Sequence, residues 1–289
     1  MTSLAFIGLG TMGYPMAGHL ARKGFKITVF NRTTEKALRW CSEFGGQYAD
    51  SPAQAARNAD IILTCVGNDD DLRAVVMGPN GIAFGLGAGA LLIDHSTVSA
   101  EVSREIAGHL ASMSAGFVDA PVSGGQQGAQ NGQLTIMCGG TTPEVERASS
   151  VISAYARAIT HIGPIGSGQL AKMVNQICVA GLVQALSEGM HFAGKAGLDV
   201  QKVMDAISQG AASSWQMVNR HKTMIAGQYE HGFAVDWMRK DLAICQAEAR
   251  HVGASLPVTA LVDQFYAEVQ AMGGGRWDTS SLLARLSKK

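Results

Sequence analysis

Lys172 and Asn175 are the pair of side chains in this sequence best suited to chemistry. They stand three residues apart in segment 166–176, so on a helix they share one face. A lysine in an otherwise apolar helix is costly unless its charge has a partner or a task. Its ammonium can donate a proton to a carbonyl oxygen, and Asn175 can orient it and hold that oxygen. The simpler interpretation is a lysine whose stem lies on apolar surface while its charge reaches water.

Two further segments carry groups that can bind an anion. Ser123, Gly124 and Gly125 follow a short apolar run, and such a turn presents a hydroxyl and open backbone N–H groups to a carboxylate. Lys240, which precedes Asp241, can reach a carboxylate or a cofactor. A loop that simply needs glycine and a surface Lys-Asp pair remain the alternatives for these two segments.

A glycine-rich turn at the start of the chain predicts a dinucleotide site. It follows an apolar run at residues 4–7 and has the spacing G-x-G-x-x-G. The first glycine permits a tight turn, the second lets a pyrophosphate approach the backbone, and the third lets the next helix pack closely. The alternative is a glycine-rich turn without a ligand. The residues of the motif are Gly8, Leu9, Gly10, Thr11, Met12 and Gly13.

The end of the second predicted strand indicates which dinucleotide is preferred. An acidic residue there selects NAD through the ribose 2′-hydroxyl, but this chain has Asn31, Arg32 and Thr33. Arg32 can offer a charge-assisted fork to a 2′-phosphate, and its neighbours can donate hydrogen bonds. We therefore expect NADP(H) to be preferred, with NAD(H) possible. A solvated loop cation is the alternative for Arg32.

The elements that must position these residues predict an α/β fold with two domains. Apolar strands alternate with helices up to about residue 160, which indicates a Rossmann-type, mostly parallel sheet. An all-α domain follows and begins with a long, apolar interdomain helix at 167–195. We expect a dinucleotide-binding domain at 1–163 and a helical substrate and dimerisation domain at 164–289. Strands are expected at 4–7, 26–30, 60–65, 90–94, 117–119 and 134–138, and helices in the first domain at 12–23, 35–44, 52–58, 69–77, 101–113 and 143–157.

Composition excludes several classes of partner. The 289 residues carry 23 basic and 23 acidic side chains without a basic block, so we expect no nucleic-acid partner. Five scattered cysteines without a C-x-x-C motif argue against a metal site and favour a reducing cytoplasm. We see no secretory leader, and the glycine-interrupted stretch 81–93 is too short for a bilayer, so we expect no membrane association. The apolar long helix predicts a homodimer or homotetramer.

The chain resembles the β-hydroxyacid dehydrogenases, the group that contains 3-hydroxyisobutyrate dehydrogenases and the tartronate, glyoxylate and succinic semialdehyde reductases. The resemblance covers essentially the whole chain. It rests on four ordered motifs: the glycine motif at 8–13, and those at 119–125, 168–175 and 240–242.

The resemblance implies a role for each candidate residue. Lys172 is the general acid/base, and Lys240 lies beside cofactor and substrate. Thr97 contacts the nicotinamide side, and the loop of Cys65 and Val66 lines the cofactor, although family members often carry Leu-Pro there. The residues implied to hold the substrate are Ser123, Gly124, Gly125 and Asn175.

These observations predict an NADP-preferring oxidoreductase that interconverts a small, carboxylate-bearing aldehyde and its hydroxy acid. Trp215, Trp237 and Met238 are expected to form an apolar wall for the rest of the substrate. NAD-dependent oxidation of the 3-hydroxyisobutyrate type is the alternative, and an inactive NADP-binding scaffold is a more distant one. Lys172 argues against an imine reductase, and the short helical region argues against a decarboxylating 6-phosphogluconate dehydrogenase.

Overall fold

The computed structural model describes residues 2–287, which divide into two compact units. The first unit ends at Lys172 and the second begins at Met173, so the junction lies inside helix α8, Ser167–Lys195. The sequence places the junction at 163/164. The difference arises because the first turn of α8 is hydrogen-bonded to unit 1, through Asp119.

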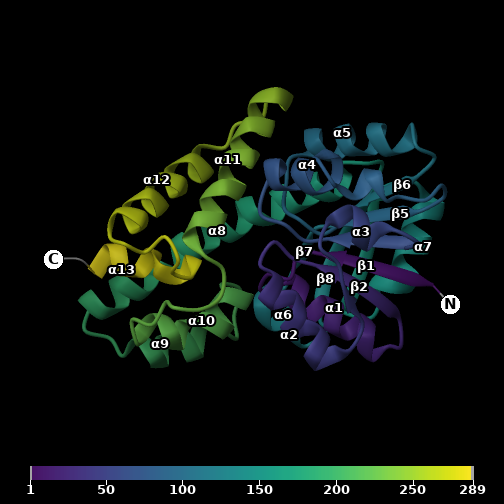
Figure 1. Cartoon of the computed structure of the whole chain (residues 1–289). Coiled ribbons are helices and arrows are strands. Elements are labelled where there is room, and N and C mark those ends of the chain that lie inside the picture. The colour runs from purple at the N-terminus through teal and green to yellow at the C-terminus, as the bar shows by residue number, and fades with distance from the viewer. Residues whose placement is uncertain (1, 288–289) are drawn as a thin grey trace. The chain divides into compact units, whose positions relative to one another are not determined.

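Unit 1 is built on a sheet that, within residues 2–287, has nine strands (Figure 1). Its order is β3-β2-β1-β4-β5-β6-β8-β7, and β9 pairs with β8. The pairs are parallel except β6 with β8 and β7 with β8, so the expected mostly parallel Rossmann-like sheet is confirmed. The strands are β1 Ser3–Ile7, β2 Lys26–Phe30, β3 Gln47–Tyr48, β4 Ile61–Thr64, β5 Leu91–Asp94, β6 Gly116–Asp119, β7 Val122–Ser123, β8 Leu134–Gly139 and β9 Ala156–Gly163.

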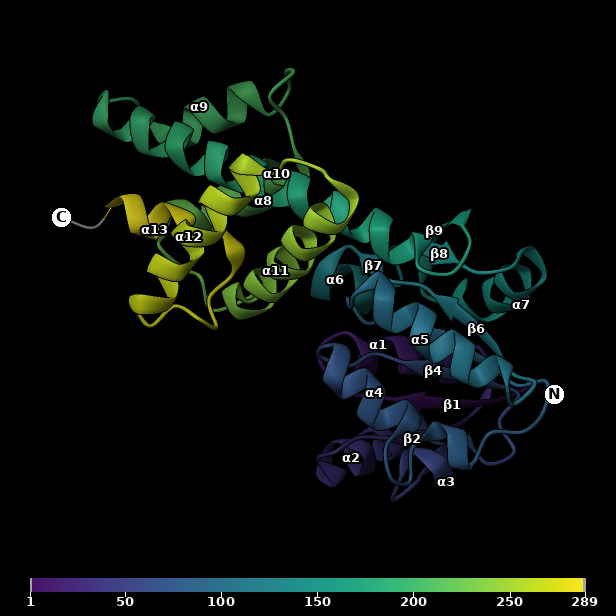
Figure 2. The same cartoon turned by 90° about the horizontal axis from the view of Figure 1, so that it is seen from above.

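Helices cover both faces of this sheet because its strands are apolar on both sides (Figures 1 and 2). Successive residues of β1 alternate between two cores: Leu4 and Phe6 pack with α1, α2 and α7, whereas Ala5 and Ile7 pack with α3, α4 and α5. The helices and 3₁₀ turn of unit 1 are α1 Gly13–Arg22, α2 Thr34–Phe44, α3 Pro52–Ala56, α4 Asp69–Met77, η1 Ile82–Phe84, α5 Ala100–Ala111, α6 Gly125–Gln130 and α7 Thr142–Ile152.

Side-chain caps explain where several of these helices begin. Ser51, Asn68 and Ser99 each accept a hydrogen bond from a backbone N–H in the first turn of α3, α4 and α5. Thr141 and Glu144 form a capping box at the start of α7. These signals can be read from sequence, so the predicted helix starts agree with the structure to within two residues.

The largest disagreement with the sequence prediction lies at residues 153–163. The helix expected at 143–157 ends at Ile152, and Ala156–Gly163 forms strand β9. Most of β9 is exposed, so its sequence lacks the apolar pattern of a buried strand. Its pairing with β8 decides its conformation. The short β3, β7 and α6 were also not predicted, because two to six residues carry too little periodicity.

Unit 2 is helical, as expected. Tyr266 and Leu242 pack with Ala180 and Val183 of α8 in one core, and Met204 packs with Leu186 and Met190 of α8 in a second. Figure 2 shows α11 and α12 side by side. The helices after α8 are α9 Val200–Ile207, α10 Trp215–Ile225, α11 Val235–Val252, α12 Pro257–Ala271, η2 Thr279–Ser281 and α13 Leu282–Ser287.

Helix α8 is long and apolar enough to cross a membrane, and within residues 2–287 it is the one helix that is. A buried helix at the core of a soluble protein meets the same criteria, and α8 supplies residues to both cores of unit 2. The expectation of no membrane association therefore stays a prediction.

Candidate functional site

The glycine motif forms the tight turn that a dinucleotide site requires. Gly8 has a φ of +98°, and a Cβ there would collide with the carbonyl oxygen of Cys65, so only glycine fits. The N–H of Leu9 donates to Oδ1 of Asn31, 2.9 Å away. The turn is thus held between the ends of β4 and β2, with both Cys65 and Asn31 in direct contact with it.

Gly10 and Gly13 have different tasks in the same turn. A Cβ on Gly13 would collide with the carbonyl of Gly8 and lie 2.9 Å from the ring of Phe6, so glycine lets α1 pack against β1. Around Gly10, a Cβ would meet open space. Met12, at the N-cap of α1, has no side-chain oxygen to occupy the first N–H groups. The open backbone at Gly10 and the start of α1 therefore fit a dinucleotide pyrophosphate.

The loop after β2 places Arg32 in solvent with a carboxylate beside it. The side chain of Arg32 is 90% exposed, and its Nη1 lies 3.4 Å from Oδ1 of Asp71, in the first turn of α4. The sequence shows no acid within the segment 31–33, but it does not reveal that α4 brings one to that loop. An ion pair this exposed is weak, about 0–1 kcal/mol, so a 2′-phosphate can displace Asp71.

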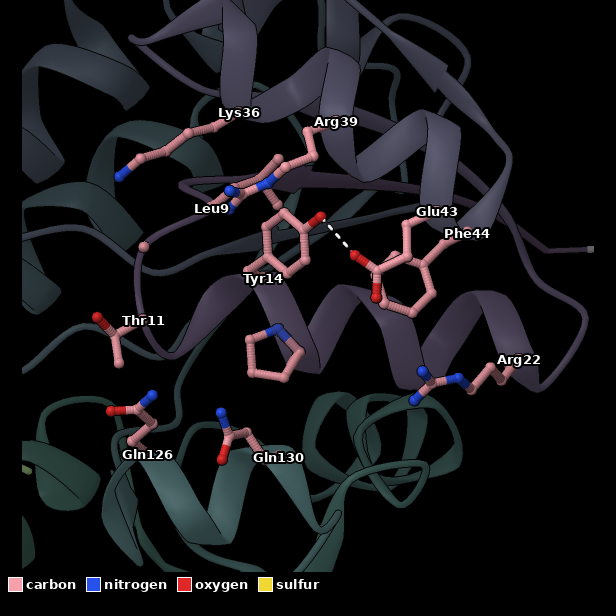
Figure 3. Close-up of a pocket in the computed structure, with 12 residues that line it drawn as sticks. Leu9, Thr11, Tyr14, Arg22, Lys36, Arg39, Glu43, Phe44, Gln126 and Gln130 are labelled. Carbon is pink, nitrogen blue, oxygen red and sulfur yellow. Dashed lines mark hydrogen bonds between the residues drawn. The ribbon is translucent and has the colours of Figure 1, made fainter.

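A groove of about 510 Å³ opens beside the glycine turn (Figure 3). Lys36 and Arg39 of α2 lie along one wall, and Gln126 and Gln130 of α6 lie along the other. The hydroxyl of Tyr14 donates to Oε2 of Glu43 at 2.8 Å in this groove. Lys36 and Arg39 were not among the predicted site residues. The sequence signal that could have found Lys36 is a basic residue soon after segment 31–33.

Asp94, at the end of β5, organises the neighbouring strand ends. Its Oδ1 accepts hydrogen bonds from the hydroxyls of Thr64 and Ser96, both at 2.7 Å, and from the Ser96 N–H. The Ser96 oxygen in turn accepts from the N–H of Val66 at 2.8 Å. Burial raises the pKa of Asp94 to about 6, although these hydrogen bonds lower it. This network holds the Cys65–Val66 loop and the Thr97 loop together.

His95 is buried next to Asp94 as a neutral imidazole. Its Nδ1 lies 2.7 Å from the carbonyl oxygen of Ala120, which can only accept, so Nδ1 carries the proton. Its Nε2 lies 2.8 Å from the hydroxyl of Tyr155 and accepts from it. Burial lowers the pKa of His95 to about 4. The hydrogen bonds of the ring to Ala120 and Tyr155 therefore fix the segment before Thr97.

Asp119, at the end of β6, anchors the start of α8. Its Oδ1 accepts from the N–H of Gly166 at 2.7 Å, and its Oδ2 accepts from the N–H of Gln169 at 2.9 Å. Burial raises the pKa of Asp119 to about 6, while the backbone hydrogen bonds lower it. Lys172, one turn further along α8, is buried, with 8% of its surface exposed. Asp119 thus fixes the first turn of α8, which leads to Lys172.

In unit 2, a polar chain connects the two predicted substrate residues Asn175 and Lys240. Asn175 Nδ2 donates to Oε1 of Gln176 at 2.8 Å, and Gln176 Nε2 donates to Oδ2 of Asp241 at 2.6 Å. Lys240 Nζ lies 2.9 Å from Oδ1 of the same carboxylate. Gln176 and Asp241 are buried, and neither was among the predicted site residues. Gln176 had a signal in the sequence, as a polar residue on the apolar helix α8, whereas Asp241 lies on a helix rich in charged residues and had no such signal.

The remaining predicted residues divide between the units. Ser123 ends β7, and Gly124 and Gly125 lead into α6 with φ values of +128° and +59°, so the predicted turn is present. Trp215 and Trp237 are 49% and 38% exposed in unit 2. Met238 is fully buried in the core of unit 2, so it does not belong to an exposed apolar wall. The structure thus corrects that part of the prediction.

Within residues 2–287, no group of three or more His, Cys, Asp or Glu side chains could hold a metal ion.

Each unit contains part of the predicted site. Unit 2 collects Asn175 and Lys240. Unit 1 collects the glycine turn, the strand-end loops of Asn31, Arg32, Thr33, Cys65, Val66 and Thr97, the turn at Ser123, Gly124 and Gly125, and Lys172.

A mostly parallel sheet with a glycine turn at its strand ends, followed by a helical unit that carries Asn175 and Lys240, is typical of a dinucleotide-dependent oxidoreductase. Comparison with known proteins agrees. Residues 3–163 match the family model of the NAD-binding domain of 6-phosphogluconate dehydrogenase, and residues 166–286 match that described as the NAD-binding domain of NADP-dependent 3-hydroxyisobutyrate dehydrogenase.

Individual relatives cover the whole chain. An uncharacterized oxidoreductase of Shewanella frigidimarina is 61% identical over 100% of this chain and 99% of its own. The mitochondrial 3-hydroxyisobutyrate dehydrogenase of Mus musculus is 32% identical over 100% and 88%. A solved structure of Mycobacterium tuberculosis 3-hydroxyisobutyrate dehydrogenase with L-serine has a TM-score of 0.89 and 28% identity, covering all of both chains.

The chain belongs to the 3-hydroxyisobutyrate dehydrogenase-like family of β-hydroxyacid dehydrogenases. It is an NAD(P)-dependent oxidoreductase of that type, and the resemblance inferred from the four sequence motifs is confirmed. The family settles the reaction class and leaves the substrate and the preferred cofactor open.

Proposed function

We propose that the protein interconverts a small, carboxylate-bearing aldehyde and its hydroxy acid, with NADP(H) as the preferred cofactor and Lys172 as the general acid/base. The observation that carries this proposal is a buried lysine on α8, three residues before Asn175, in a chain with a dinucleotide turn. An ammonium at this place on α8 can donate a proton to a bound carbonyl oxygen.

In the proposed reduction, the carbonyl group of the substrate gains one hydride at carbon and one proton at oxygen. When bound, the reduced nicotinamide supplies the hydride that reaches the carbonyl carbon. Lys172 Nζ donates the proton that the carbonyl oxygen takes up, and its positive charge stabilises that oxygen as negative charge develops. Asn175 holds the same oxygen through its amide. In the direction of oxidation, Lys172 accepts the alcohol proton.

The turn at Ser123, Gly124 and Gly125 is proposed to bind the substrate carboxylate. Positive φ values at both glycines orient successive backbone N–H groups, which supports an anion-binding turn. The names of the relatives support the same substrate class, because 3-hydroxyisobutyrate and L-serine are both carboxylic acids with a hydroxyl on the β-carbon. Lys240 is proposed to lie beside cofactor and substrate.

The preference for NADP(H) is proposed from the charge around the loop after β2. Arg32 is exposed there, and Lys36 stands in the first turn of the helix that follows. Both can pair with a 2′-phosphate. NAD-dependent oxidation of a 3-hydroxyisobutyrate-type substrate is the second candidate, and the names of two relatives, both 3-hydroxyisobutyrate dehydrogenases or similar to them, support its substrate.

We further propose a homodimer or homotetramer in the cytoplasm, without nucleic-acid or membrane partners. Val174 and Phe192 on α8 are 61% and 71% exposed, and Val258 and Leu261 on α12 are 61% and 54% exposed. Apolar surface of this extent supports association with a second copy. Light scattering at micromolar concentration tests it, and a clean monomer would reject it.

The testing experiment measures NADPH and NADH oxidation with succinic semialdehyde, glyoxylate, methylmalonate semialdehyde and tartronate semialdehyde. Turnover of one aldehyde acid by wild-type protein, lost by a factor of about 10²–10⁴ in Lys172→Ala, is the expected result. Lys172→Ala should bind NADPH as wild type does, because Lys172 is not part of the glycine turn. Near-normal turnover by Lys172→Ala would contradict the mechanism.

A further inference from the structure

The side chain of Gln169 bridges the peptide groups on both sides of Thr97. Its Nε2 donates to the carbonyl oxygen of Ser96 at 2.8 Å, and its Oε1 accepts from the N–H of Val98 at 3.2 Å. Gln169 is fully buried. Since one partner only accepts and the other only donates, the orientation of the amide is determined. The loop that contains Thr97 is therefore tied to the first turn of α8.

The backbone of Gln169 makes a further hydrogen bond, in addition to the two that its side chain makes. Its N–H donates to Oδ2 of the buried Asp119, whose Oδ1 accepts from Gly166. Gly168 permits this close approach, since a Cβ there would lie 2.7 Å from the Asp119 carbonyl oxygen and 2.8 Å from its Oδ2. A carboxylate at a helix N-terminus is also favoured by the helix dipole. The first turn of α8 therefore has little freedom to rotate or slide.

Ser96 is held from the opposite side as well. Asp94 accepts from both the hydroxyl and the N–H of Ser96, so the loop lies between Asp94 and Gln169. Lys172 stands three residues after Gln169, about 4.5 Å further along the helix axis. The position of Lys172 along α8 is consequently linked to that of the Thr97 loop by a single side chain.

We propose that Gln169 is a positioning residue: it keeps Lys172 and the loop of Thr97 in register, so that the proton donor and the predicted nicotinamide contact stay aligned. This rests on the proposed function, in which Lys172 donates the proton. Gln169 itself touches neither substrate nor cofactor in this proposal. It acts through the two peptide groups that it bonds and through the first turn of α8, in which it lies.

The first test is Gln169→Met, which keeps the length of the side chain and removes both hydrogen bonds. In the protein without cofactor, the amide of Val98 should exchange with deuterium at least tenfold faster than in wild type. With an accepted aldehyde acid, kcat should fall by about 10- to 100-fold, in line with the cost of a displacement near 1 Å. The Kd for NADPH should stay within about threefold, because the glycine turn is untouched.

Two further variants keep the test decisive. Gln184→Met is the matched control: it is a buried glutamine on the same helix, bonded to Glu188, and its substitution should leave kcat and Val98 exchange unchanged. Gln169→Glu is a second disruption in case the methionine variant fails to fold. It keeps an acceptor for Val98 but faces the Ser96 carbonyl with an oxygen, so kcat should fall in the same direction.

The double variant Gln169→Met with Lys172→Ala separates positioning from general destabilisation. If Gln169 acts through Lys172, the methionine substitution should cause no additional loss in single-turnover rate once the lysine is absent. Equal losses in both backgrounds would overturn the inference. So would near-normal kcat in both Gln169 variants when Lys172→Ala is inactive. Near-normal turnover in Lys172→Ala would instead reject the proposed function itself.

Discussion

Lys240 Nζ lies 2.9 Å from Oδ1 of Asp241, its own neighbour on α11. Asp241 is 1% exposed and also accepts from Gln176, which holds Asn175. One buried carboxylate thus orients a lysine and an amide that come from different helices of unit 2. Both of these side chains are proposed to meet the substrate or cofactor.

Replacing that carboxylate should therefore weaken substrate binding. In Asp241→Asn, Lys240 loses its charge partner, and the amide offers one acceptor oxygen where the carboxylate offers two, so Lys240 and Gln176 can no longer both be satisfied. Breaking a buried pair on one side is costly. We expect KM for the acid substrate to rise roughly tenfold or more, which corresponds to about 1.4 kcal/mol or more. Steady-state kinetics measures it. Asp263→Asn is the control, because it breaks the Arg239 pair on α11 at 2.9 Å and should leave KM unchanged.

Asp71 should limit the affinity for NADP(H). Its carboxylate lies beside Arg32, and removing it in Asp71→Asn should lower the Kd for NADPH by about threefold, within the range of an exposed ion pair, with the Kd for NADH unchanged. Arg32→Asp should reduce the NADPH/NADH ratio of kcat/KM. Asp70→Asn, on the same helical turn and 95% exposed, serves as the control for Asp71. An unchanged ratio in Arg32→Asp would contradict the cofactor assignment.

Substitution of Gly10 and of Gly13, the second and third glycines of the turn, should have different effects. Gly10→Ala should fold with unchanged Tm, since its Cβ meets open space, yet bind NADPH at least tenfold more weakly because the pyrophosphate can no longer approach. Gly13→Ala should lower Tm without any cofactor present, because its Cβ collides with the Gly8 carbonyl. Calorimetry of each variant with and without NADPH separates the two effects. Tight NADPH binding by Gly10→Ala would place the pyrophosphate elsewhere.

His95 should make stability depend on pH in a known direction. Its pKa falls from 6.5 to about 4 on folding, so between these pH values the unfolded chain binds a proton that the folded protein does not. The contribution of His95 to the free energy of unfolding therefore increases as pH rises through this window and is lost as pH falls. His95→Asn keeps a donor for Ala120 but cannot titrate, so its destabilisation should be larger at pH 7 than at pH 5.

Urea denaturation at the two pH values measures this difference. Asp94 and Asp119 have raised pKa values of about 6, so their contributions decrease as pH rises through the range from 3.8 to 6. Both carboxylates are present in wild type and in His95→Asn, so comparing the two proteins isolates the imidazole. Equal destabilisation at pH 5 and pH 7 would show that His95 is not held neutral.

Local signals explain why much of the fold could be predicted. The buried strands carry continuous apolar runs, and Ser51, Asn68 and Ser99 mark helix starts through their own side chains. Strand β9 could not be predicted in this way, because pairing with β8 and not its own residue pattern makes it extended.

The sequence by itself determined the residue types and their spacing: the glycine turn, the lysine and asparagine one turn apart on a helix, and the family that these motifs define. Only the tertiary structure decided which distant groups support them. Asp71 reaches Arg32 from 39 residues away, Gln169 reaches Ser96 from 73 residues away, and Asp241 reaches Gln176 from 65 residues away. The physical reason is that periodicity reports which face of an element is buried, whereas hydrogen bonds between buried polar groups depend on which elements the fold brings together.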